Sequence, residues 1–165
     1  MSTATDRAGA EWAPRVWFVA ARQRLERFPL AVILLAMRIG VGSVFFKAGL
    51  LKYQSFEFAV KLFEDEYKVP ILSPNVAARI TMFNELTWPV FLFLGLATRF
   101  ATLPILGSIT VIQLFVYPSA WTENLVWASI LVLLLTRGAG ALSVDFLIDR
   151  YFEKRKAGVP PSPSL

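Results

Sequence analysis

Residues 30–52 form a stretch that is long and apolar enough to cross a membrane, yet it contains an arginine. The stretch reads LAVILLAMRIGVGSVFFKAGLLK, and the arginine is Arg38. An α-helix rises about 1.5 Å per residue, so about 20 apolar residues span the roughly 30 Å hydrocarbon core of a bilayer. An arginine near the middle of such a span costs at least ~2.5 kcal/mol on insertion. We therefore expect Arg38 to face the interior of a helix bundle, where another group offsets this cost.

The composition indicates an integral membrane protein with one domain. The chain has 165 residues, of which 56% are hydrophobic, whereas soluble domains contain about 45–50% apolar residues. It contains no cysteine and no histidine, so we expect no metal site and no redox cofactor bound through these residues. The net charge of +5 comes from cations at the ends of apolar segments, as in membrane topology, so we do not expect nucleic-acid binding.

Three further apolar segments follow the first one. The four expected spans cover residues 30–52, 76–97, 100–117 and, counted from Ser119, 119–136. Because the connection at Thr98 and Arg99 is short, the second and third spans should lie antiparallel. The expected fold is therefore all-α, an integral membrane four-helix bundle that occupies residues 30–147.

Amphipathic segments flank the expected bundle on both sides. Residues 1–29 combine arginines with aromatic side chains, a composition suited to a helix in the lipid headgroup region. Residues 53–74 interleave aromatic and acidic residues, which is typical of a short helix against the mouth of the bundle. Residues 142–156 are predicted as another amphipathic helix. It leads into a basic tail, residues 148–165, whose end from residue 158 is rich in Pro and Ser and is expected to be disordered.

The topology follows from the lysines and arginines in the flanking segments. Residues 1–29, the turn at Arg99 and residues 137–156 hold most of these cations, whereas the turn around Glu123 holds none. We therefore expect a multi-pass protein with both termini in the cytoplasm.

Glu85 is the expected counter-charge inside the bundle. It lies about 18 Å from the cytoplasmic side, whereas Arg38 lies at about 12 Å and Lys47 at about 25 Å. Side chains lean toward the N-terminus of their own helix, so Arg38 leans away from Glu85 and Lys47 leans toward it. Either cation could hold the carboxylate. Lys52, at the outer end of the first span, is expected to reach the headgroups.

The surroundings of Glu85 suggest a quinone pocket. The residues that helical spacing places on its face are Thr81, Met82 and Trp88. As candidate catalytic residues, Glu85 would exchange protons and Arg38 would stabilise negative charge on a quinone oxygen, with Lys47 as a further binding residue. The alternative is a structural ion pair that only fixes the register of the helices.

Three pieces of the chain resemble the DoxX family of small four-helix membrane proteins. They are LLAMRIGVGSVFFKAGLLK in the first span, NELTWPVFLFLGLATR at the end of the second, and RGAGALSVD after the last. The resemblance covers roughly residues 30–147 and implies a protein of the bacterial inner (plasma) membrane that is associated with oxidoreductases. That family includes the small subunit of thiosulfate:quinone oxidoreductase. The polar positions that the resemblance carries over are Arg38, Lys52, Glu85, Arg99 and Asp145.

Two further pieces are similar to one branch of the family. VPILSP and IQLFVYPSAW resemble the branch that accompanies metal-responsive peptide-modification clusters. Where many relatives have a histidine near the end of the third helix, this chain has Tyr117.

Asp145 and Arg99 are expected to face each other at the cytoplasmic rim, as a structural clasp between a turn and the tail.

Two main hypotheses for function follow. In the first, the chain is a redox-associated subunit in the lipid bilayer that binds quinone, or couples a partner oxidoreductase to the quinone pool. The partner then supplies the redox cofactor, and we expect such a protein partner or a homo-oligomer. In the second, the chain is a non-catalytic membrane scaffold for a metal-stress, oxidative-stress or peptide-modification system. A third, conduction of a small solute or ion, rests on the intramembrane charges alone.

Overall fold

The structure is a computed structural model that describes residues 17–67, 70 and 72–157, and it divides into two units, Met1–Leu30 and Ala31–Leu165. The described part is helical and contains no strand, which confirms the all-α prediction. In the first unit, residues 17–26 form a helix with an exposed ion pair between Arg22 and Glu26 at 2.7 Å. Such an exposed pair contributes little stability. The disordered end predicted from residue 158 lies outside the described residues.

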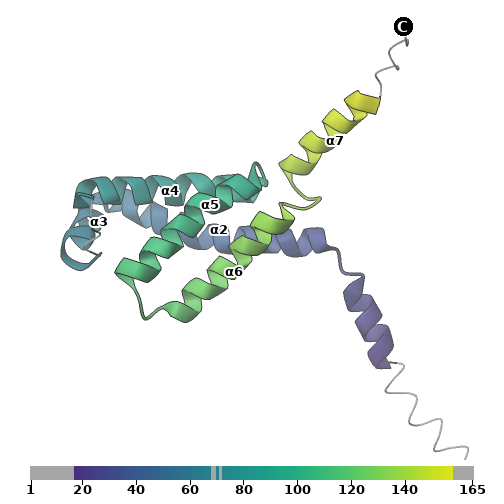
Figure 1. The fold of residues 1–165 in the computed structure, drawn as a ribbon, viewed down its shortest axis with the longest axis horizontal. Coiled ribbons are helices and arrows are strands. Elements are labelled where there is room, and N and C mark those ends of the chain that lie inside the picture. Colours follow the sequence, from purple (N-terminus) through teal and green to yellow (C-terminus); the bar gives the residue numbers. More distant parts are fainter. Residues whose placement is uncertain (1–16, 68–69, 71, 158–165) are drawn as a thin grey trace, which may run out of the picture. The chain divides into compact units, whose positions relative to one another are not determined.

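The helices of the second unit follow the expected order closely. They are α2 (Leu30–Gln54), α3 (Phe56–Leu62), the π-helix η1 (Phe63–Tyr67), α4 (Pro74–Leu94), α5 (Thr98–Val111), the π-helix η2 (Ile112–Val116), α6 (Trp121–Arg137) and α7 (Val144–Ala157) (Figure 1). The four expected spans correspond to α2, α4, α5 with η2, and α6. The segment between the first two spans folds as α3 and η1, and the amphipathic tail helix is α7.

One hydrophobic core joins α2, α4, α5 and α6. Its fully buried members are Leu34, Val41, Phe45, Leu92, Ala101, Ile105, Ile109, Leu131 and Leu134. Phe45 of α2 meets Trp127 of α6 edge to face, with ring centroids 5.8 Å apart, a favourable aromatic geometry. A second, smaller cluster packs Phe63 of η1 against Ala77 and Ala78 at the start of α4. The beginning of α4 is therefore covered by α3 and η1 rather than by the main core.

Glycines on α2 allow α4 to approach closely. A Cβ atom added to Gly42 would lie 2.6 Å from the ring of Phe93, and one added to Gly49 would lie 2.8 Å from the Cβ of Glu85. Real Cβ contacts are essentially never this short. Small residues permit such close helix packing in membrane proteins. The two glycines thus fix the line along which α2 and α4 meet.

Main-chain hydrogen bonds build the turn between α4 and α5. Gly95 has a left-handed φ of 66°, and its amide donates to the carbonyl of Leu92 at 3.1 Å. The amide of Leu96 donates to the carbonyl of Phe91 at 3.0 Å. Together these bonds form a Schellman motif, which satisfies the last carbonyls of α4. The position needs a glycine because an L side chain rarely adopts this φ.

The carboxylate of Asp145, at the start of α7, caps the N-terminus of α5. It accepts hydrogen bonds from the amides of Ala97 at 2.7 Å and Thr98 at 3.0 Å. A negative charge there satisfies free N–H groups and complements the helix dipole. The expected clasp between the turn and the tail is therefore present, but the carboxylate binds backbone amides of the turn, whereas Arg99 donates to the carbonyl of Thr136 at 3.5 Å.

Two segments among the described helices are long and apolar enough to cross a membrane, α2 and the continuous run Thr98–Val116. In the most apolar part of α2 only 28% of the residues are buried inside the protein. In the most apolar part of Thr98–Val116 only 22% are buried. Most of each helix therefore presents side chains outward, unlike the core helix of a soluble domain. Exposed large apolar residues of the four long helices include Ile33, Ile39, Leu51, Phe83, Leu94, Phe100, Leu103, Leu114, Leu125, Val126 and Val132.

Candidate functional site

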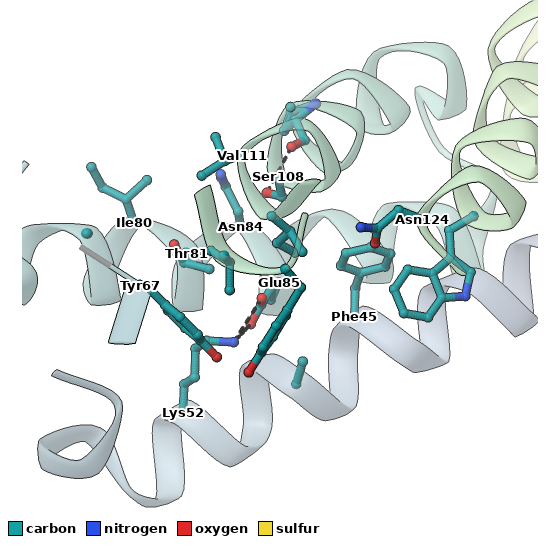
Figure 2. A pocket seen from close by; sticks show the side chains of 18 of the residues that line it. Phe45, Lys52, Tyr67, Ile80, Thr81, Asn84, Glu85, Ser108, Val111 and Asn124 are labelled. Atoms are coloured by element: carbon teal, nitrogen blue, oxygen red, sulfur yellow. Dashed lines mark hydrogen bonds and ion pairs between the residues drawn. The ribbon is translucent and has the colours of Figure 1, made fainter. Parts of the chain in front are cut away.

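The charged centre of the candidate site is an ion pair between Lys52 of α2 and Glu85 of α4. The Lys52 Nζ atom lies 2.9 Å from Oε1 and 2.7 Å from Oε2 of Glu85 (Figure 2). The side chains are 16% and 4% exposed, so water screens the pair little. The partner of Glu85 is therefore neither Arg38 nor Lys47, and Lys52 turns into the protein instead of reaching the headgroups.

Local geometry explains this pairing. Gly49 brings the backbone of α4 against α2 at Glu85, and Lys52 lies one turn further along α2. Because side chains on a helix lean toward its N-terminus, Lys52 leans back toward the level of Gly49. The ammonium group thereby reaches both carboxylate oxygens. A buried pair of this kind is strongly destabilised when only one partner is removed.

The ion pair lies in the wall of a cavity of about 620 Å³. Residues from α2, α4, α5 and α6 and both π-helices line this cavity, and most of them are apolar. Its inward polar groups come from Lys52, Glu85, Thr81, Asn84, Asn124 and Tyr67 (Figure 2). Ligand pockets typically have about 300–1,000 Å³ with apolar walls and a few polar groups. The cavity has both the size and the wall chemistry of a small-molecule site.

Two asparagines that the sequence reasoning missed line the cavity with the ion pair. Asn124 is 3% exposed, and its amide donates to the side-chain oxygen of Gln113 at 2.8 Å. The Gln113 amide in turn donates to the carbonyl of Pro118 at 2.8 Å. Asn84 accepts a hydrogen bond from the indole of Trp88 at 3.1 Å. Amide side chains within apolar helices were the available signal, since polar residues there are costly and usually face the interior.

The two π-helices place a pair of tyrosines beside the cavity. The rings of Tyr67 and Tyr117 meet edge to face with centroids 5.8 Å apart, and the Tyr117 hydroxyl donates to Glu66 at 3.2 Å. Burial, reinforced by the neighbouring Tyr117, raises the pKa of Tyr67 above its usual range. Like any tyrosine at neutral pH, Tyr67 is protonated and can donate a hydrogen bond. π-Helical segments are often found at functional sites.

Arg38 lies far from this cavity. It is fully buried, and its guanidinium donates to the carbonyls of Leu92 at 3.2 Å and Leu142 at 2.5 Å. Lys52 is about 21 Å further along α2, at 1.5 Å per residue. The structure therefore separates the two predicted catalytic residues, Arg38 and Glu85. Arg38 binds the C-terminal end of α4, where a cation also complements the helix dipole.

Only part of the predicted quinone pocket lines the cavity. Thr81 and Glu85 do, whereas Met82, Trp88 and Lys47 do not. Trp88 packs against Phe100 with ring centroids 5.6 Å apart. Among residues 17–67, 70 and 72–157, no group of three or more acidic, Cys or His side chains could hold a metal ion.

Comparison with known proteins adds two matches. The model of the family described as DoxX matches residues 33–118, about half of the chain. A protein of Haemophilus influenzae, described as an uncharacterized protein, is 27% identical over an alignment of 139 residues, and the match covers 78% of this chain and 91% of that protein. No solved structure shows significant similarity to the chain.

Proposed function

This chain belongs to the DoxX family, and from that premise we propose that it is a quinone-binding subunit of the bacterial inner membrane. In this proposal α2, α4, α5 with η2, and α6 form a four-span bundle with both termini in the cytoplasm. A partner oxidoreductase supplies the electrons. The observation that carries the proposal is the buried Lys52–Glu85 pair in the wall of a largely apolar cavity.

The outer surface of the helices supports a position in lipid. Large apolar side chains are exposed on all four long helices, for example Ile39, Phe83, Leu114 and Leu125. Soluble monomers rarely expose contiguous apolar patches of more than a few hundred Å². In a bilayer the same side chains contact hydrocarbon, and the helices satisfy their backbone groups internally. This also agrees with a family of membrane proteins.

The cavity residues fit a quinone head group. Apolar walls such as Phe45, Val111 and Trp127 suit the faces of the ring. The Lys52 ammonium and the Tyr67 hydroxyl can donate hydrogen bonds to the carbonyl oxygens of a quinone, while the Glu85 carboxylate can accept one from a hydroxyl of the quinol. A small number of polar groups in an apolar pocket is enough to fix the orientation of a ligand.

The chemistry follows from these groups. A bound quinone supplies the redox change, since it takes up two electrons and two protons to become a quinol. Lys52 would stabilise negative charge on the ring oxygen next to it, because a fixed cation in a dry site acts strongly. Glu85 would exchange one of the two protons with that oxygen, as a general acid–base group, and the other proton would come from water. The chain has no cysteine or histidine, so in this proposal the partner holds the electron-transfer centre.

The direct test is quinone binding to the purified protein in lipid nanodiscs. Trp127 lines the cavity, so binding of a decyl-substituted benzoquinone should quench tryptophan fluorescence with a saturable dependence on concentration. We expect Glu85→Gln and Lys52→Gln each to weaken binding at least tenfold. Lys52→Arg, which keeps the charge, should retain more affinity than Lys52→Gln.

Lys47→Gln is the matched control. Lys47 is on the same helix, but it is exposed and does not line the cavity. Its substitution should leave binding unchanged. No saturable binding to the folded wild-type protein, or equal affinity of wild type and Lys52→Gln, would contradict the proposed site.

The exposed face of α7 favours a second candidate function, a scaffold that docks another protein. Leu147, Tyr151 and Phe152 are exposed on this helix among charged residues. If docking is the function, Tyr151→Ser with Phe152→Ser should abolish cross-links between α7 and the partner and leave quinone binding unaffected. If the chain is instead a quinone-linked subunit, Glu85→Gln should abolish the reduction of quinone by the partner.

A further inference from the structure

The polarity of the cavity wall changes from its interior to one of its edges. Inside, Glu85 and Asn124 are each 3% exposed. At the edge formed by α4, α5 and the segment before α4, the exposed side chains that line the cavity are those of Leu72, Ile80 and Val111, at 41%, 47% and 39%. Single exposed apolar residues are common in proteins, but a cluster of them marks contact with a partner, a ligand or a membrane. The exposed side chains of this edge are apolar instead, whereas its polar members Thr81, Asn84 and Ser108 are only partly exposed.

The same edge is where α4 and α5 separate. The helices are joined at the turn around Gly95 and diverge away from it (Figure 1). Near the turn they are packed closely, since Leu92 and Ala101 are fully buried. At the far end, Ile80 of α4 and Val111 of α5 both line the cavity.

A glycine leaves additional room in this gap. Gly107 of α5 lines the cavity and is exposed, and a Cβ added to it would meet nothing within 4 Å. By contrast, atoms of α4 already occupy the space that a Cβ would take at Gly42 or at Gly49. Gly107 therefore has no packing role that requires a glycine, and its effect is to keep the gap wide.

A charged residue marks a different end of the cavity. Glu123, in the first turn of α6, is exposed and also lines the cavity. A carboxylate at the end of an apolar helix belongs at the aqueous face of a membrane rather than in hydrocarbon. The cavity thus has one edge suited to water and another suited to lipid.

We infer that the gap between α4 and α5 is a lateral portal to the bilayer, and that the ligand has a polar head and a long hydrocarbon tail that leaves through this portal. The inference rests on the proposed quinone site for the head group and adds the tail and the route of entry. The cavity of about 620 Å³ is in the range that encloses a drug-sized molecule. A long isoprenoid chain does not fit beside the ring and must extend past Ile80, Gly107 and Val111 into lipid.

The first test asks whether the portal faces lipid, and it does not depend on any quinone. Because the chain has no cysteine, single cysteines can be introduced by Gly107→Cys, Gly40→Cys and Glu123→Cys and labelled with a nitroxide. Gly40 is an exposed glycine of α2 with nothing within 4 Å of an added Cβ, outside the cavity. In nanodiscs, the label at residue 107 should match that at 40, with high accessibility to oxygen and low accessibility to nickel-EDDA. A label at residue 107 that matches residue 123 would overturn the portal.

The second test asks whether the tail occupies the portal. Gly107→Phe should weaken binding of the decyl-substituted benzoquinone about tenfold and leave the tail-less dimethoxy-methyl benzoquinone within twofold of wild type. Gly40→Phe, the matched substitution, should change neither affinity. Equal weakening for both quinones, or none, would overturn the tail site. If the wild type bound neither quinone, the proposed function would fail, while the nitroxide result would still decide whether the cavity opens to lipid.

Discussion

Gly49 of α2 and Glu85 of α4 face each other so closely that a methyl group on the glycine would overlap the glutamate. The added Cβ would lie 2.8 Å from the Glu85 Cβ and 2.9 Å from its carbonyl carbon. This contact sets the level at which α4 crosses α2. It also places Glu85 within reach of Lys52, one turn away, so the position of the ion pair depends on a residue that has no side chain.

Gly49→Ala should therefore destabilise the protein and loosen the ion pair. Forcing a methyl group into a filled space typically costs about 1–3 kcal/mol. The measurement is thermal unfolding in detergent, followed by circular dichroism. Gly40→Ala is the control, since its Cβ meets nothing within 4 Å and alanine is favoured over glycine in a helix by up to about 1 kcal/mol. Equal stability of the two variants would contradict the close approach.

Lys52→Gln should lower the free energy of unfolding by about 3 kcal/mol or more. It leaves the carboxylate of Glu85, whose side chain is 4% exposed, without its cation, and breaking a buried pair from one side has this cost. The double variant Lys52→Gln with Glu85→Gln should recover part of the loss, because no buried charge remains. The double-mutant cycle measures the coupling. Additive effects of the two substitutions would show that the pair does not form.

Asp145→Ala should lower stability by about 1 kcal/mol, the usual contribution of a helix N-cap. Asp145 supplies this cap from α7, because Ala97 has no side chain that could do so. Asp149→Ala, on the exposed surface of the same helix, should have little effect. Thermal unfolding of the two variants, side by side with wild type, provides the comparison. Similar midpoints for both would indicate that the cap contributes nothing.

Ala97→Gly should stabilise the protein. Ala97 has a left-handed φ of 46°, which costs an L-residue roughly 1–2 kcal/mol. Glycine adopts this φ freely, although its greater freedom in the unfolded chain offsets part of the gain. We expect a net rise of up to about 1 kcal/mol in the unfolding free energy. The amide hydrogen bond to Asp145 is retained in this variant, so a fall in stability would show that Ala97 is not strained.

The sequence was sufficient to predict the helices and their order, because each apolar segment is long and is bounded by Gly, Pro or charged residues. Glu85 and Thr81 were also identified as candidate site residues, since an acid within an apolar helix is expensive. The asparagines of the cavity were missed because an amide in one helix does not show which other helices it meets. Their convergence depends on how α4, α5 and α6 pack, which spacing along one helix does not reveal.

The partner of Glu85 was missed for a specific physical reason. The expected depth of Glu85 in the membrane assumed that the second span starts at the level where the first span ends. In the structure, about 16 Å of α4 precedes Glu85, while only about 8 Å of α2 follows Gly49. The extra length of α4 packs against η1 through Ala77 and Ala78. The helices are therefore offset, and Lys52 rather than Arg38 reaches the carboxylate.

The turn around Gly95 has a mechanical consequence for the rest of the molecule. Arg38 binds the end of α4 through Leu92, and Asp145 binds the start of α5 through Ala97 and Thr98. With these ends anchored, the direction in which α5 leaves the turn is set at its first residues. Over the length of α5, about 20 Å at 1.5 Å per residue, a difference of about 5° in this direction corresponds to about 2 Å at the far end. The hydrogen bonds at the turn therefore contribute to the distance between α4 and α5 at the cavity.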